Sequence, residues 1–301
     1  FDKVSNILKK MAGYYEQIER TDRFYPSLFR VGFYGNYGPE FKNKDFVYRG
    51  DVLESIGDFT TRIKNKFPTA KMLGVKINAD EEMFNSEEQF LQISKITPGT
   101  LKEYTGPQSG DAQVKPEWSL AVPPRFVRDY ADNNKICVFW YVRPFRKKKE
   151  KSANEFLDLW VEKLYLKTEE ILPSNQRRSC VVEKKTVYIN PLENAVTEIE
   201  KKNAELREKF NSMELLGDGE ADNTYTMALN GVVDAAVNGG IGNYVTFIDG
   251  TYKTINPEIY EDVNSTVEKR LIGGRLVEVL QDQLDILQWG VRVHKTKCSA
   301  T

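Results

Sequence analysis

The pattern of hydrophobic and polar residues changes its period at Asn190, and this change predicts two kinds of structure in one chain. Before Asn190, short runs alternate apolar and polar residues between segments rich in Gly, Asn and Pro, as in antiparallel strands joined by turns. After it, apolar residues recur every three or four positions, as in amphipathic helices. The pattern therefore predicts an α+β protein, with a β-rich lobe of antiparallel sheets followed by an antiparallel helical-bundle lobe.

The strand pattern is strongest at 134–143, where large apolar residues occupy every second position. Two runs within 27–50 enclose a segment rich in Gly, Asn and Pro, which predicts a hairpin loop at 35–44. We expect further strands at about 70–77 and 89–97, and a loop at 105–117.

The segment 155–172 is ambiguous, because its apolar residues fit either a helix or a strand that follows a short helical turn. A short helix is predicted upstream, since Ser55 and Asp58 have the spacing of a capping box and Pro68 ends the apolar pattern.

Longer helices are predicted near both ends of the chain. Residues 3–20 carry an apolar stripe with polar residues opposite. At the change of period, Asn190 is suited to the N-cap, Pro191 to the first helical position and Glu193 to completing a capping box. Another helix is expected to begin at Asn256–Pro257. A long final helix follows it, in which Gly273–Gly274 marks a point of division into two.

An interrupted helix is predicted after Asp222–Asn223. Its apolar residues keep helical spacing as far as Val237, and Asn238, Gly239 and Gly240 then favour departure from helical geometry. A second apolar run follows at 244–248. Read from the residues alone, such a break is usually the ordinary end of a helix, because glycine is a common C-cap.

Composition limits the classes of function. Lys and Arg number 43 against 44 Asp and Glu, so the net charge of −1 gives no field that favours nucleic acid. Three widely spaced cysteines, Cys137, Cys180 and Cys298, form no disulfide framework and suit a reducing compartment. No apolar run is long enough for a membrane span. The first residue is Phe and the start is unlike a signal peptide, so we expect a piece of a longer protein.

Candidate catalytic chemistry is sparse. His294 is the one histidine, and a lone histidine near a helix carboxyl end usually complements the helix dipole or is solvated. The Gly-rich run 239–242 does not follow a strand, as a dinucleotide or phosphate loop would require. We therefore expect no cofactor, no metal site and no covalent chemistry. The basic run 146–151 is interpreted as a solvated hairpin tip rather than as a contact with anionic lipid.

Two separate segments resemble one known family. The run Leu229–Gly240, LNGVVDAAVNGG, resembles the nucleotide-sensor segment of the DOCK family of guanine nucleotide exchange factors. The run Tyr188–Ala195, YINPLENA, is similar to the strand-to-helix junction of that family. Shorter similarities occur in the family's order at 31–35, 46–50, 67–70 and 154–162. Together they cover roughly residues 14 to 294 and imply the family's exchange domain, also called DOCKER or DOCK homology region two, which acts on Rho-type GTPases.

The resemblance implies a division of the chain. Residues 1–24 would be the terminal helix of a preceding helical lobe that mediates dimerisation. Residues 25–189 would be the β-rich lobe, which grips the first switch of the GTPase, and 190–301 the helical lobe that carries the nucleotide sensor. The resemblance also favours the strand interpretation of 155–172, paired with 179–189 in a long hairpin.

The resemblance also assigns roles to residues. Val237 would be the nucleotide sensor, inserted where the GTPase holds magnesium, while Asn238, Gly239 and Gly240 let the backbone approach the phosphate site. The GTPase-binding residues implied are Asn230, Gly231, Asp234 and Ala236. The partner is a Rho-family GTPase, bound most tightly in its nucleotide-free form, and the segment is closer to the Rac-directed branches than to the others.

Other implications concern the full-length protein: homodimerisation, contacts with adaptor proteins and lipid through regions outside this sequence, and a cytoplasmic location with recruitment to the plasma membrane. Its signalling would act on the cytoskeleton and cell migration. Two alternatives stay open. One is a DOCK-like scaffold that binds a GTPase or adaptor without exchange activity, and the other is a hydrolase whose site the sequence does not reveal.

Overall fold

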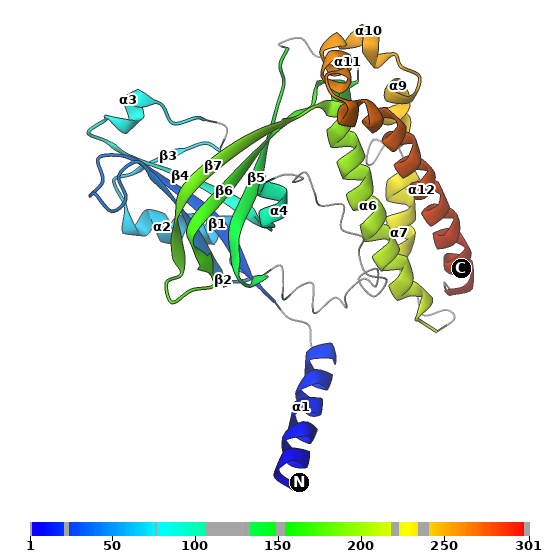
Figure 1. The fold of residues 1–301 in the computed structure, drawn as a ribbon, viewed down its shortest axis with the longest axis horizontal. Coiled ribbons are helices and arrows are strands. Elements are labelled where there is room, and N and C mark those ends of the chain that lie inside the picture. Colours follow the sequence, from blue (N-terminus) through cyan, green and yellow to red (C-terminus); the bar gives the residue numbers. More distant parts are fainter. Residues whose placement is uncertain are drawn as a thin grey trace. The chain divides into compact units, whose positions relative to one another are not determined.

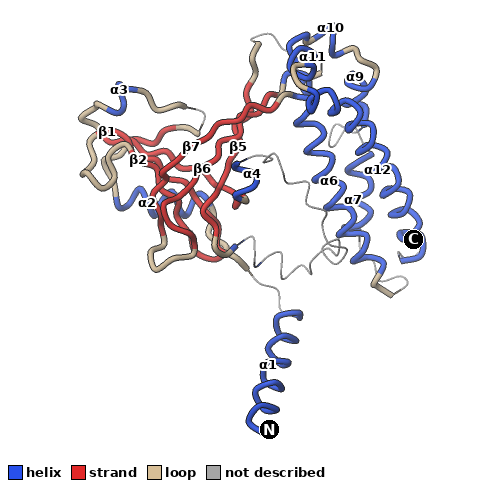
Figure 2. The backbone as a smooth tube through the Cα atoms, viewed as in Figure 1, coloured by secondary structure: helices blue, strands red, loops and turns tan. Residues whose placement is uncertain are grey.

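The computed structural model describes residues 2–20, 24–75, 77–105, 130, 133–148, 154–217, 223–233 and 241–297. The chain divides into two units (Figures 1 and 2). The first joins Phe1–Arg143 to Lys163–Val187, and the second joins Pro144–Glu162 to Tyr188–Thr301. Each unit is therefore assembled from two separate stretches of sequence. The chain contains both helices and strands, which confirms the predicted α+β class.

Strands dominate the first unit. They are β1 (Pro26–Gly35), β2 (Lys44–Val52), β3 (Lys71–Leu73), β4 (Gln89–Gly99), β5 (Ile136–Phe145), β6 (Trp160–Leu172) and β7 (Arg178–Ile189). The helices before β5 are α1 (Asp2–Arg20), α2 (Ile56–Lys66), α3 (Glu81–Phe84) and α4 (Leu101–Thr105). The boundary between the units falls within β5, β6 and β7, whose ends belong to the second unit.

The strand pairing closes on itself. The order is β1-β2-β7-β6-β5-β4-β3, and β1 also pairs with β4, so that six of these strands form a ring to which β3 adds in parallel at β4. Val31 on β1 pairs with Phe46 on β2 on one side and with Ile93 on β4 on the other. Strand β1 therefore has hydrogen-bonded neighbours along both edges.

Alternate residues of β1 enter two different cores, as the period of a strand requires. Phe29, Val31 and Phe33 belong to one cluster, which α2 covers with Phe59 and Ile63. The rings of Phe29 and Phe59 stack with their centroids 4.1 Å apart. The opposite cluster includes Leu28 from the same strand. Both faces of β1 are thus buried.

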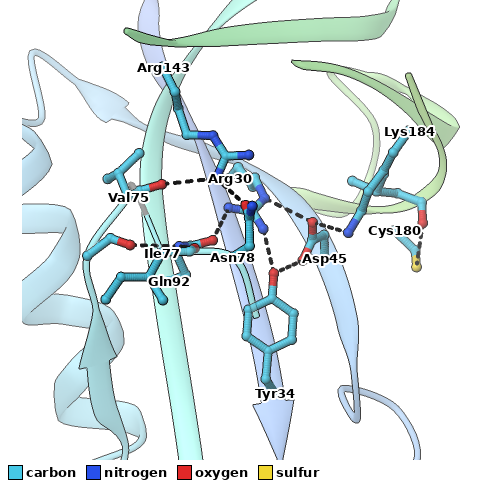
Figure 3. A network of polar contacts seen from close by, with 12 residues as sticks. Arg30, Tyr34, Asp45, Val75, Ile77, Asn78, Gln92, Arg143, Cys180 and Lys184 are labelled. Carbon is cyan, nitrogen blue, oxygen red and sulfur yellow. Dashed lines mark hydrogen bonds and ion pairs between the residues drawn. The ribbon is translucent and has the colours of Figure 1, made fainter. Parts of the chain in front are cut away.

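A buried charged network connects strands of the first unit (Figure 3). The Arg30 guanidinium donates from Nε to Asp45 Oδ2 at 2.9 Å, from Nη1 to Gln92 Oε1 at 2.8 Å, and from Nη2 to the Tyr34 hydroxyl. That hydroxyl donates to Asp45 Oδ1 at 2.8 Å. Lys184 adds a second positive charge, with Nζ 2.6 Å from Asp45 Oδ2. Four strands, β1, β2, β4 and β7, are therefore joined by charge-assisted contacts.

The network shifts the pKa values of its members. Burial would raise the pKa of Asp45, but the charges of Arg30 and Lys184 outweigh burial and lower it. Burial raises the pKa of Tyr34 well above its usual range. Gly32 makes room for the arrangement, because a Cβ there would lie 2.8 Å from Asp45 Oδ1 and 2.6 Å from the ring of Tyr34. Asp45 therefore remains ionised in the folded protein.

Helices make up most of the second unit. They are η2 (Glu155–Asp158), α6 (Pro191–Glu214), α7 (Asn223–Val233), η3 (Ile241–Tyr244), α9 (Val245–Ile248), α10 (Tyr252–Ile255), α11 (Pro257–Asn264) and α12 (Val267–Lys297). Helices α6 and α12 share two apolar clusters. A buried polar contact joins them as well, since Asn203 Nδ2 donates to the Val279 carbonyl at 2.9 Å and Gln283 Nε2 donates to Asn203 Oδ1 at 3.0 Å.

Several local predictions are confirmed. Asn190 caps α6 in a capping box with Glu193, with Pro191 in the first turn. Ser55 caps α2, which ends at Lys66. The segment 160–172 is a strand that neighbours β7 and follows the short turn η2, so the helix interpretation of 155–172 is wrong beyond that turn. Helix α1 agrees with the predicted 3–20, and its apolar stripe, which includes Leu8 and Tyr14, is exposed.

Other predictions need correction. Gly273–Gly274 does not divide the last helix, because α12 runs without a break from Val267 to Lys297. Neighbouring Ile272 and Leu276 pack in the core of the second unit, which outweighs a glycine cost of about 1 kcal/mol per residue. The short helices α3 and α4 were not predicted, since four or five residues give too little periodicity. The predicted loop 105–117 lies outside the described residues apart from Thr105, which ends α4.

Within the described ranges, no helix is both long and apolar enough to cross a membrane.

Two glycines of α12 give a matched test of its packing. A Cβ at Gly290 would lie 2.6 Å from Cζ of Phe210 on α6, whereas nothing lies within 4 Å of a Cβ at Gly274. We expect Gly290→Ala to destabilise the protein by about 1–3 kcal/mol through overpacking. Gly274→Ala should stabilise it by about 0.5–1 kcal/mol, because alanine loses less backbone entropy in a helix. Thermal unfolding measures both, and shifts of the same sign would contradict the packing described here.

The Asp45 network makes a prediction about acid stability. The lowered pKa of Asp45 contributes stability that is fully present above the unfolded pKa of about 3.9 and is lost as the pH falls through the folded value. Asp45→Asn should therefore cost about 3 kcal/mol at pH 7, and its difference from the wild type should shrink below about pH 4.

Urea unfolding between pH 7 and pH 3 measures this difference. Glu88→Gln is the control, because Glu88 pairs with Lys71 on the surface and such a pair contributes at most about 1 kcal/mol. A cost for Asp45→Asn that does not change with pH would contradict the assigned ionisation.

Candidate functional site: the flanks of the predicted sensor segment

The structure describes both flanks of the predicted sensor segment. Asn230 and Gly231 lie in the last turn of α7, where Asn230 is exposed and Gly231 is half-buried. The other predicted site residues, Asp234, Ala236, Val237, Asn238, Gly239 and Gly240, lie outside the described residues. The description resumes with η3 at Ile241. The helix α7 before 234–240 and the turn η3 after it therefore define where the predicted sensor segment begins and ends in the sequence.

The leading helix, α7, is held by one apolar face. Ala228 and Val232 are buried in a cluster with Phe210 and Met213 of α6 and Ile286 of α12. Because these positions recur at helical spacing, the opposite face of α7 carries exposed residues such as Met227 and Asn230. The predicted contact residue Asn230 thus lies on the solvent side of an anchored helix.

The single histidine reinforces this anchor. His294 lies in the last turn of α12, and its Nε2 is 2.7 Å from the Thr226 hydroxyl of α7. The lone histidine was expected at a helix end, but its partner lies 68 residues earlier in the chain and could not be predicted from spacing. The hydrogen bond ties the middle of α7 to the end of α12.

The outgoing flank is held by a turn from far upstream. Asn154 caps η2 and donates from Nδ2 to the Asn243 carbonyl at 2.9 Å and to the Thr246 hydroxyl at 3.0 Å. The ring of Phe156 meets that of Tyr244 edge-on, with centroids 5.8 Å apart. Burial raises the pKa of Tyr244, so its hydroxyl stays neutral at physiological pH. We call Asn154 together with η2 the Asn154 turn.

The Asn154 turn is itself fixed in the second unit. Leu157 is fully buried and Trp160 nearly so, in a cluster with residues of α6, α11 and α12. The Asn256 side chain, which follows α10, donates to the Leu157 carbonyl at 3.0 Å. The sequence signal for this turn was the match at 154–162, but its partners lie 89 to 99 residues away and could not be predicted from spacing.

The start of the basic run makes contacts within the second unit. Arg146 pairs with Glu155 at 3.2 Å and Lys147 pairs with Glu258 at 3.6 Å. The Lys147 ammonium also lies 3.3 Å from the centroid of the Trp160 ring, a cation–π contact. Both residues are exposed, so these contacts lie at the surface, and 149–151 lie outside the described residues.

In the part of the chain that the structure describes, no three or more His, Cys, Asp or Glu side chains gather in a way that could hold a metal ion. The geometry of the flanks is that of two anchored ends, which can present a short segment to a partner.

Comparison with known proteins identifies the family. Residues 76–171 match the family model described as DHR-2, Lobe B. The chain is 34% identical over 297 residues to dedicator of cytokinesis protein 3 of Mus musculus and to dedicator of cytokinesis protein 4 of Homo sapiens. It is 22% identical over 248 residues to the DOCK-like protein 1 of Saccharomyces cerevisiae.

These alignments cover 98% of the chain for the two mammalian proteins and 80% for the yeast protein. The chain spans 14% of the length of each mammalian relative and 12% of the yeast relative. The similarity to the mammalian proteins thus extends over both units. The lobe B match and the identity over nearly the whole chain agree with the sensor and junction motifs, and the chain belongs to the DOCK family as a DHR-2 domain.

Proposed function

We propose that this chain is a guanine nucleotide exchange domain for a Rho-family GTPase, with Rac favoured. The observation that carries the proposal is the run LNGVVDAAVNGG in a DHR-2 domain, which begins in the anchored helix α7 and ends directly before the turn η3 in the sequence. Anchored ends support this function because a short segment that is fixed on both sides can enter a partner's site without the loss of much conformational freedom.

The proposed mechanism acts on the partner's magnesium ion. A Rho GTPase holds its nucleotide through its phosphate loop, a lysine and a magnesium ion that bridges phosphate oxygens. Val237 supplies no oxygen ligand, and its β-branched side chain is stiff about χ1, so its insertion displaces the ion and its waters. Without the ion, the phosphate charges lose much of their compensation. Asn238, Gly239 and Gly240 let the backbone approach closely.

The loss of nucleotide affinity fixes how much binding free energy the domain must supply. The nucleotide affinity of the GTPase has to fall by several powers of ten, each of which corresponds to about 1.4 kcal/mol. By linkage, the domain must bind the nucleotide-free GTPase more tightly by the same factor. One valine contact is too small for this, so the β-rich part is proposed to grip the first switch while Asn230, Gly231, Asp234 and Ala236 contact the GTPase beside the sensor.

The remaining proposals concern the protein to which this domain belongs. We propose a cytoplasmic protein that is recruited to the plasma membrane and dimerises through a helical lobe of which 1–24 is the last helix. Adaptor proteins and lipid would bind through other regions. The exposed apolar stripe of α1 is consistent with a helix that packs against further protein. No covalent step is needed for this function.

Substitution of the sensor tests the mechanism. Val237→Ala should leave the fold and the affinity for nucleotide-free Rac unchanged, but slow the release of mant-GDP from Rac by about tenfold or more in the presence of magnesium, because alanine leaves room for the ion. Val277→Ala is a matched control, since Val277 is an exposed valine on α12.

Wild-type release by Val237→Ala would count against the sensor role. Tight binding of nucleotide-free GTPase by the wild-type chain without acceleration would favour the scaffold alternative, and turnover of GTP by the chain alone would favour a hydrolase.

The preference for Rac has its own test. Nucleotide-free Rac-type and Rho-type GTPases, immobilised at equal density, should retain the chain unequally, with Rac retaining at least about tenfold more, or about 1.4 kcal/mol. Adding GDP and magnesium should release it, because exchange requires the nucleotide and the domain to compete. Equal retention by all members would overturn the specificity while leaving the exchange function intact.

A further inference from the structure

We propose that Asn154 is a positioning residue for exchange, which fixes the outgoing end of the sensor segment through Asn243 and Thr246. This inference rests on the proposed function and deepens it, because it adds a residue more than eighty positions from the sensor to the exchange machinery. The observations that carry it are the side-chain geometry of Asn154, the burial of the turn behind it and the short chain distance from η3 to the sensor.

Asn154 uses its whole side-chain amide. Its Oδ1 accepts a hydrogen bond from the Phe156 backbone N–H at 3.0 Å, which caps η2. Both hydrogens of Nδ2 are used in the other direction, toward the Asn243 carbonyl at 2.9 Å and the Thr246 hydroxyl at 3.0 Å. A side chain that could only accept, or one without polar atoms, cannot make this bridge.

The hydrogen bonds of Asn154 join the buried turn η2 to η3 and α9, which follow the sensor segment in the sequence. Behind Asn154, Leu157 and Trp160 are buried among helices of the second unit. In front of it, Asn243 and Tyr244 belong to η3, which is the first described element after the sensor segment. Asn154 therefore transfers the fixed position of the buried turn to residues that directly follow the sensor.

Chain geometry limits how far the sensor can depart from this anchor. Gly240 precedes Asn243 by three residues, and a fully extended chain spans at most about 3.6 Å per residue. Three residues of chain upstream of Asn243 can therefore reach at most about 11 Å from it, whatever path they take. The incoming end is held by the packing of α7 and by the bond between Thr226 and His294. The residues that flank the segment on both sides are therefore anchored to the rest of the second unit, and Asn154 provides the anchor on the outgoing side.

The hydrogen bonds of Asn154 that position η3 can be removed without removing the apolar contacts of the neighbouring core. The aromatic contact of Phe156 with Tyr244 and the apolar cluster around Leu157 do not require the Asn154 amide. Loss of the amide should therefore loosen η3 locally while most of the second unit stays folded. Small displacements of a group that must reach a defined place lower a rate strongly, by up to about a hundredfold per ångström.

Two substitutions of Asn154 and two of Thr246 form the experiment. Asn154→Ala removes all three hydrogen bonds, and Asn154→Asp keeps the acceptor for Phe156 but loses the donors. Thr246→Val removes the hydroxyl, and Thr246→Ser keeps it. The GDP release rate from mant-GDP-loaded Rac, the affinity for nucleotide-free Rac and the hydrogen–deuterium exchange of residues 241–248 are measured for each.

We expect release to slow about tenfold in both Asn154 variants and about threefold in Thr246→Val, with Thr246→Ser at the wild-type rate. Affinity for nucleotide-free Rac should stay within about twofold, because the anchor affects the approach of the sensor rather than the wide interface. Exchange of the 241–248 amides should rise in the three slowed variants only.

Asn190→Ala is the matched control. Asn190 also caps a helix through Oδ1, and its Nδ2 donates across to another helix, to Asp262 Oδ2 at 2.7 Å. Its bridge joins α6 to α11 and includes no residue of η3. This variant should unfold at a lower temperature yet release GDP at the wild-type rate while it is folded.

The outcomes separate the inference from the function beneath it. Wild-type release by Asn154→Ala, or slowed release that is matched by equally weakened binding and by the Asn190→Ala control, would overturn the positioning role alone. An absence of exchange by the wild-type chain would overturn the proposed function and the positioning role together. Slow release by Asn154→Ala with unchanged binding and faster amide exchange at 241–248 supports the inference.

Discussion

The burial of Leu157 and Trp160 among α6, α11 and α12 is the contact on which the second unit depends. Full burial of each such side chain contributes about 2–3 kcal/mol, and together they fix a turn that the strands β5 and β6 deliver from the middle of the sequence. The cap of η2, the contact with Tyr244 and the bond from Asn256 all originate at this turn. The hydrogen bonds that hold the outgoing flank at Asn243 and Thr246 start from this turn.

A buried polar centre contributes to the packing of each unit. In the first unit, the guanidinium of Arg30 donates to Asp45 and Gln92, so that one side chain joins the strands β1, β2 and β4. In the second, Asn203 joins α6 to α12 through Val279 and Gln283. Buried polar groups are costly unless every partner is in place, so both centres disfavour shifted registers. The flanks of the sensor segment are held by a unit whose helix pairing is specified in this way.

Local features of the fold were predictable, and distant partners were not. The alternation at Ile136–Val142 and the capping box at Asn190 depend on neighbours within a few residues, so sequence alone located β5 and the start of α6. Gly273–Gly274 misled because a local preference of about 1 kcal/mol is smaller than the packing energy around it. The bonds of Arg30 to Asp45 and Gln92 and that of Asn154 to Thr246 join residues 15, 62 and 92 positions apart, which no periodicity reports. The sensor assignment came from resemblance to a family, since the residues around Val237 carry no chemistry of their own.

The discontinuity of the second unit has a consequence for biosynthesis. During synthesis, Leu157 and Trp160 leave the ribosome well before α11 and α12. These apolar side chains therefore cannot be fully buried until partners about a hundred residues later have been made. Closing such a large loop costs entropy before any contact repays it, which makes assembly slow and leaves an aggregation-prone intermediate. A fragment beginning at Asn190 would lack this turn, and the apolar side chains of α6, α11 and α12 that pack against Leu157 and Trp160 would be exposed to water.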